Sequence, residues 1–156
     1  MIDRHTRAGQ VDFSDLNEKP KKETRVDRTK RAAWISVLLY AVLIFILSSR
    51  PDLPDMDFFI EINDKVAHII LYTPLGFLLR RALSLHKNMT AFQTAVLTLI
   101  IGVLYGISDE LHQAFVPGRY ADAADVLADA VGVLFGSTAF YFLRKQQPGL
   151  RAETNE

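Results

Sequence analysis

The chain has 156 residues, which suits a single domain, and 49% of them are hydrophobic while 23% are charged. That hydrophobic share is high for a soluble protein, so the charged residues must be segregated along the chain. The formal net charge is zero and there is no cysteine, which argues against nucleic acid as a partner and excludes a disulfide framework, a thiolate metal site and a cysteine nucleophile.

Charged and polar residues dominate the first 30 positions, with no hydrophobic period. Such a segment cannot bury enough apolar surface to fold, and we expect residues 1–30 to form a disordered cytoplasmic tail. Residues 146–156 are similarly polar. They form a second predicted cytoplasmic tail, which leaves residues 31–145 as the folded domain.

Four apolar segments fill this domain, at residues 32–48, 65–83, 91–108 and 123–143. Each approaches the length needed to cross a bilayer core of about 30 Å. A cleavable signal peptide is a poor explanation of the first segment, because the polar leader before it is too long. Pro74 lies inside the second segment and predicts a kink there. We therefore expect an all-α, integral membrane four-helix bundle.

The loops alternate in charge, and this predicts the orientation of the bundle. Basic residues precede the first segment and follow the second and fourth, whereas the other two connections are acidic. Because lysine and arginine collect on the cytoplasmic side, both termini should be cytoplasmic and the acidic loops should face outward. The basic residues nearest the segment ends are Lys30, Arg31, Arg80, Arg81, Lys87, Arg144 and Lys145.

Ionisable residues gather at the predicted outer ends of the last three segments. Lys65, His68 and Tyr72 are spaced i, i+3 and i+7, so they share one helix face. The corresponding faces of the next two segments carry Gly102, Gly106, Asp109 and Gln113, and then Asp122, Asp125, Asp129, Gly132 and Gly136. Charged groups are costly in a membrane unless they are paired or used, so this convergence predicts a functional site.

The glycines predict how the last two segments meet. Gly102 and Gly106, and likewise Gly132 and Gly136, form small-x-x-x-small pairs. Such pairs allow close helix approach, and we expect the third and fourth segments to pack through them and to splay around a polar pocket. The alternative is that these patterns merely reflect how common small residues are in membrane helices.

Asp129 lies deepest in the predicted site, about 6 Å below Asp125 along the helix. A lone carboxylate there would take up a proton, so we expect it to pair with a cation, a metal or a donor such as Tyr72 or Tyr105. His68 either belongs to the same site or is a neutral imidazole bonded to a neighbouring helix.

Pro117 and Gly118 between the third and fourth segments predict a type II turn. Arg119 follows the turn. It is expected either to bind an anionic ligand or to form a structural ion pair with Asp122 or Asp125.

These motifs resemble those of the VanZ-like membrane proteins, a family named after a teicoplanin resistance protein. The resemblance covers residues 35–143. It rests on Asp64-Lys65-Val-Ala-His68 with Tyr72, on Tyr105-Gly106, on Asp109-Glu110-Leu-His112-Gln113-Ala-Phe115-Val-Pro117-Gly118-Arg119, and on Asp122, Asp125 and Asp129. It implies a small multi-pass protein of the bacterial cell (inner) membrane, acting at the envelope and associated in some bacteria with lowered glycopeptide susceptibility.

The first functional hypothesis is a binding protein. Its outer-face site would take an anionic lipid, a lipid-linked envelope precursor or a glycopeptide-type amphiphile. Lys65 and Arg119 would meet the anionic group, and the remaining candidate ligand-binding residues are His68, Tyr72, Tyr105 and Gln113.

The second hypothesis is a membrane-embedded enzyme acting on a lipid head group, with or without a metal. Its candidate catalytic residues are Asp109, Glu110, His112, Asp125 and Asp129, with Glu110 as general base, and its candidate metal ligands are His68, Asp109, His112, Asp125 and Asp129. No established metal or nucleophile motif is present, so enzyme status and cofactor stay open. The third hypothesis is a structural or transport role, in which the polar cluster holds the four helices together or passes protons. For transport, four short spans would require an oligomer.

Overall fold

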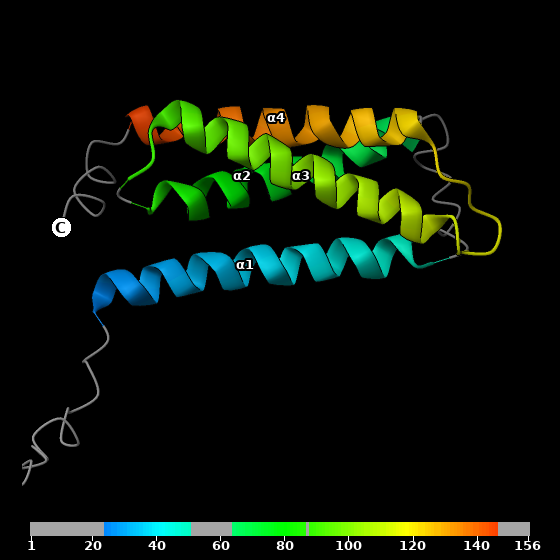
Figure 1. The fold of residues 1–156 in the computed structure, drawn as a ribbon, viewed down its shortest axis with the longest axis horizontal. Coiled ribbons are helices and arrows are strands. Elements are labelled where there is room, and N and C mark those ends of the chain that lie inside the picture. Colours follow the sequence, from blue (N-terminus) through cyan, green and yellow to red (C-terminus); the bar gives the residue numbers. More distant parts are fainter. Residues whose placement is uncertain (1–23, 51–63, 87, 147–156) are drawn as a thin grey trace, which may run out of the picture.

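The computed structural model describes residues 24–50, 64–86 and 88–146, and within them every regular element is an α-helix. The helices are α1 (Arg25–Ser48), α2 (Asp64–Ser84), α3 (Ala91–Gln113) and α4 (Ala123–Gln146) (Figure 1). All four are long and apolar enough to cross a membrane. The predicted all-α architecture with four spans is confirmed. Most of the two predicted tails (residues 1–23 and 147–156), most of the first acidic loop and Lys87 lie outside the described residues.

Helix α1 begins earlier than the apolar segment that predicts it. Thr24 is its N-cap and forms a capping box with Asp27, in which each side chain accepts a bond from the other's backbone N–H. Two free backbone donors of the first turn are thereby satisfied. Residues 25–30, assigned from composition to the disordered tail, are therefore helical.

The two ends of the bundle differ in charge. At the end where α1 and α3 begin and α2 and α4 end, the helices carry Lys30, Arg31, Arg81, Arg144 and Lys145, and we call it the basic end (Figure 1). At the opposite end, named here the acidic end, lie Asp109, Glu110, Asp122 and Asp125. The charges therefore flank an apolar middle, as a membrane-spanning bundle requires.

The closest helix approach joins α2 to α4. A Cβ atom added at Gly132 would lie 2.6 Å from the backbone oxygen of Ile69, and one added at Gly136 would collide with the backbone of Thr73. Both glycines of α4 thus face α2, which corrects the expectation that they pack on α3. Glycines on α3 do face α4, but they meet side chains, with Gly102 against Val133 and Gly106 against Asp129.

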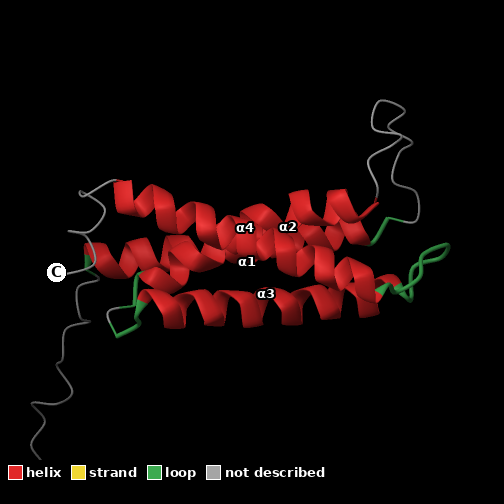
Figure 2. Cartoon of the chain, turned by 90° about the horizontal axis from the view of Figure 1, so that it is seen from above, coloured by secondary structure: helices red, strands yellow, loops and turns green. Residues whose placement is uncertain are grey.

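Helix α1 packs against α2 and α3 through one face that includes Ala33, Val37 and Ile44. Two tyrosines reinforce this contact, because Tyr40 donates to the Leu71 carbonyl at 3.0 Å and Tyr105 donates to the Ala41 carbonyl at 2.5 Å. Figure 2 shows the four helices running lengthwise beside one another. Large apolar side chains on the outer faces are exposed, as expected where lipid is the solvent: Leu38, Leu39, Phe92, Leu104, Leu134 and Phe135.

Candidate functional site

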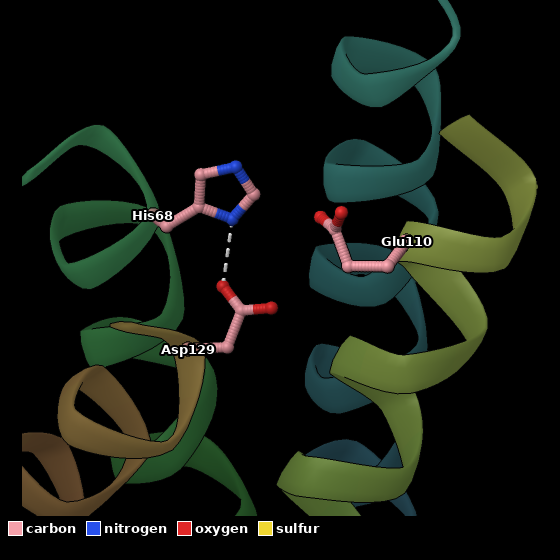
Figure 3. A group of neighbouring side chains, drawn as sticks. All are labelled: His68, Glu110 and Asp129. Carbon is pink, nitrogen blue, oxygen red and sulfur yellow. Dashed lines mark hydrogen bonds and ion pairs between the residues drawn. The ribbon is translucent and has the colours of Figure 1, made fainter. Parts of the chain in front are cut away.

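Three buried side chains meet at the acidic end, one from each of α2, α3 and α4. They are His68, Glu110 and Asp129, named here the histidine–carboxylate cluster (Figure 3). His68 Nδ1 lies 2.9 Å from Asp129 Oδ1. Glu110 points toward the pair from the opposite side, and the three residues offer ligand atoms that all lie within 4.8 Å of one another.

Two carboxylate oxygens of this cluster lack a hydrogen-bond partner within the described part of the chain, namely Glu110 Oε1 and Asp129 Oδ2. Asp129 is fully buried. Buried polar atoms are nearly always bonded, because leaving one unpaired costs the full desolvation penalty. A cation or a proton bound to these oxygens would remove that cost.

Lys65 sits above the cluster, half-exposed. Its Nζ is 2.7 Å from Asp122 Oδ2 and 2.7 Å from Asp125 Oδ1, and the other Asp125 oxygen is 4.0 Å from His68 Nε2. The bond from Lys65 holds the pKa of Asp122 below its ordinary value, because it stabilises the carboxylate. The Asp122 backbone N–H donates to Glu110 Oε2 at 2.9 Å, which ties the loop to the cluster.

A second cluster joins α1 to α3 and is named here the serine–aspartate cluster: Ser48, Asp109 and Gln113. Ser48 Oγ donates to the Asp109 carboxylate, lying 2.6 and 2.8 Å from its two oxygens, and Gln113 Nε2 donates to the same group at 3.1 Å. Beside it, Ser49 Oγ is 2.9 Å from His112 Nε2. Neither serine was predicted from the sequence, because a hydroxyl at a helix end is too common to indicate a role.

The loop before α4 places Arg119 against α1. Its backbone N–H donates to the Val116 carbonyl at 3.1 Å, and Gly118 has a φ of 84°, which agrees with the predicted type II turn. Arg119 Nη1 approaches the Ser48 carbonyl at 3.5 Å. Within the described residues no ion pair joins Arg119 to Asp122 or Asp125, and Lys65 bonds to both of these carboxylates.

A small cavity of about 40 Å³ lies beside both clusters. Its polar lining comes from Ser48, His68, Tyr72, Asp109, Gln113 and Arg119. The Tyr72 hydroxyl is buried and has no hydrogen-bond partner in the described part of the chain. This volume is enough for about one water molecule or one small polar group.

The predicted site residues are divided between the histidine–carboxylate cluster, the serine–aspartate cluster and the cavity beside them. Of the five candidate metal ligands, His68 and Asp129 meet, and Glu110 joins them in place of the other three. Asp109 bonds to Ser48, the last residue of α1, His112 bonds to its C-cap Ser49, and Asp125 bonds to Lys65. Tyr105, offered as a partner of Asp129, bonds to α1 instead.

One imidazole nitrogen and two carboxylate oxygens form a ligand set that zinc and manganese accept. Three protein ligands leave further coordination positions for water or a bound head group. The histidine–carboxylate cluster can thus hold a divalent cation if the side chains tighten slightly around it. Its chemistry would then be Lewis-acid binding or activation of an oxygen ligand.

The motifs of the acidic end fall within the part of the chain that matches a known family. A family model described as VanZ/LLP1 matches residues 13–144. No curated protein and no solved structure matches the chain.

Proposed function

Since the chain belongs to the VanZ/LLP1 family and has four helices able to cross a membrane, we propose that it acts in a bacterial cell envelope by binding an anionic amphiphile. The ligand is an anionic lipid, a lipid-linked precursor or a glycopeptide-type amphiphile. It is held at the acidic end by Arg119 and by a divalent cation on His68, Glu110 and Asp129.

Two observations carry this proposal. Glu110 and Asp129 each keep one buried oxygen without a partner in the described residues, and each offers a ligand atom within 4.8 Å of a ligand nitrogen of His68. A structural network would be expected to satisfy both oxygens, as the serine–aspartate cluster does for Asp109. A cation-binding site leaves them open for the ion.

Charge balance favours a cation as the intermediary. Lys65 is already bonded to two carboxylates, so it has little capacity left for an anionic ligand. Asp125 and Asp129 stand directly beside His68 and would repel an anion that entered alone. A divalent cation reverses that repulsion, and Arg119 supplies a second positive contact at the cavity.

The test is metal titration of the purified protein by calorimetry and elemental analysis, using Zn²⁺ and Mn²⁺ in separate runs. We expect one ion per chain and at least a tenfold loss of affinity in His68→Gln and in Asp129→Asn. His86→Gln is the matched control, because His86 is exposed and lies next to the loop after α2. Equal binding by wild type and both cluster variants would contradict the proposal.

The ligand half of the proposal needs a separate measurement. Native mass spectrometry with and without the bound ion should show one additional anionic lipid in the metal-loaded protein, and less of this metal-dependent lipid in Arg119→Gln. Metal binding without retention of this lipid would support the ion site and contradict the binding of an anionic amphiphile there.

A second candidate, a metal-dependent enzyme acting on a lipid head group, is favoured by the open coordination positions and by the unbonded Tyr72 hydroxyl at the adjacent cavity. In this case His68 and Asp129 alone would hold the ion, and Glu110 would act as general base toward a water on that ion. Head-group release from a lipid phosphate or pyrophosphate, lost in Glu110→Gln while metal binding persists, would distinguish it from simple binding.

A further inference from the structure

A buried arginine lies at the basic end, far from the histidine–carboxylate cluster. Arg80 on α2 is only 5% exposed, and it is twelve positions beyond His68, about 18 Å along an ideal helix. Its Nη1 donates to Ser137 Oγ at 3.1 Å and its Nη2 to the Ala91 carbonyl at 2.7 Å. Within the described residues, Arg80 forms no ion pair with a carboxylate.

Among residues 24–50, 64–86 and 88–146, no carboxylate compensates the charge of Arg80. Neutral acceptors orient the guanidinium, and the ring of Tyr141 lies 5.9 Å from its central carbon, but none of these groups carries a negative charge. Arg144 adds a like charge nearby. A buried cation in a membrane protein normally has an anionic partner, since desolvation without one is costly.

Arg80 also forms part of the wall of a large groove between α3 and α4, with a volume of about 400 Å³. The rest of the lining is mainly apolar and includes Phe92, Val96 and Leu99 of α3 with Leu134, Thr138 and Tyr141 of α4. Phe92 is 76% exposed and Leu134 is 53% exposed, so the groove opens on the surface that lipid covers. The apolar side chains of α3 and α4 therefore suit an acyl chain, and Arg80 suits an anionic group.

We infer that this groove binds an anionic phospholipid from the leaflet at the basic end. Its phosphate pairs with Arg80, and one acyl chain lies between α3 and α4. The occupant follows from charge complementarity, because a guanidinium with no carboxylate partner in the described part of the chain favours an anion and the apolar walls favour hydrocarbon. The neighbouring Arg81, Arg144 and Lys145 raise the local concentration of anionic lipid in that leaflet.

The test is native mass spectrometry of the full chain in mild detergent supplemented with phosphatidylglycerol or phosphatidylcholine. The wild-type protein should retain one phosphatidylglycerol molecule, with at least tenfold preference over phosphatidylcholine. Arg80→Gln should lose the lipid, whereas Arg81→Gln should keep it, because Arg81 is exposed and does not line the groove. The two substitutions remove the same charge at neighbouring positions of one helix, so Arg81→Gln is the matched control.

Ala95→Phe keeps Arg80 but fills the groove, so it tests the proposal even if Arg80→Gln does not fold. We expect it to lose the lipid while remaining monodisperse. Equal retention of the two lipids, or equal effects of Arg80→Gln and Arg81→Gln, would overturn the inference. An Arg80-dependent fatty acid in place of phosphatidylglycerol would overturn the phospholipid as occupant.

Discussion

At the residue scale, Asp109 illustrates what a satisfied carboxylate in this bundle requires. Its oxygens accept from Ser48 and Gln113, so two helices are joined through one buried anion. In Ser48→Ala the buried carboxylate loses its short bonds from α1. We expect the variant to lose about 1.5–3 kcal/mol of stability, measured by unfolding in detergent.

Ser36→Ala is the control for this change. Ser36 also lies on α1, but its hydroxyl donates only to the Ala32 carbonyl of its own helix at 2.9 Å. Removing such a bond should alter stability by less than about 0.5 kcal/mol. Similar losses in the two variants would mean that the Ser48–Asp109 bond contributes little to helix packing.

Lys65 gives a second residue-scale prediction. It lowers the pKa of Asp122 through a direct bond, so Lys65→Met should raise that pKa toward the ordinary value. Because the folded pKa is depressed, the contribution of the pair to stability is present above the unfolded pKa, near 3.9, and is lost as the pH falls through the folded pKa. NMR titration of the labelled aspartate carboxyls measures the change. An unchanged Asp122 titration in Lys65→Met would show that the bond is not maintained in solution.

At the scale of elements, the contact between α2 and α4 depends on the absence of side chains. A Cβ at Gly136 would meet the backbone oxygen of Thr73, which cannot move aside without displacing the helix. Gly136→Ala should therefore push α4 from α2 and destabilise the protein by about 1–3 kcal/mol in thermal or denaturant unfolding.

Ala139→Val adds methyl groups to the exposed face of the same helix and serves as the comparison. It should leave the unfolding midpoint nearly unchanged. If the two variants unfold alike, the close approach at Gly136 is not a determinant of stability.

Hydrophobic periodicity predicted the helices and the buried faces of α3 and α4, including Asp109, Asp129, Gly102 and Gly132. It did not predict which helix each face would meet. The glycine pairs of α3 and α4 look alike in sequence, yet Gly102 contacts a side chain of α4 and Gly132 contacts the backbone of α2. A one-dimensional pattern defines a face, whereas the partner depends on how all four helices pack.

The same limit applies to the candidate site. Ionisable residues at helix ends indicated His68 and Asp129, because charge in an apolar context is informative by itself. Glu110 was assigned as a base and not as a ligand, since its distance to His68 depends on how α2 and α3 are placed. Ser48 bonds to Asp109 from a helix that carries no charge over its apolar stretch, so no pattern in the sequence indicated that it belongs to the site.

At the scale of the whole molecule, the difference between the two ends predicts orientation. Basic residues of α1, α2 and α4 gather at one end and carboxylates at the other, so the basic end should be cytoplasmic and the acidic end should face outward. Both described ends of the chain, Thr24 and Gln146, would then lie on the cytoplasmic side.

The chain has no cysteine, so single cysteines can report this orientation without background. Tyr120→Cys places a thiol in the exposed loop at the acidic end, and Asn88→Cys places one in the exposed loop at the basic end. A membrane-impermeant maleimide added to intact cells or spheroplasts should label position 120 only, and permeabilised cells should label both. Labelling of position 88 alone in intact cells would invert the bundle and turn the histidine–carboxylate cluster toward the cytoplasm, where its ligand would have to be a cytoplasmic head group.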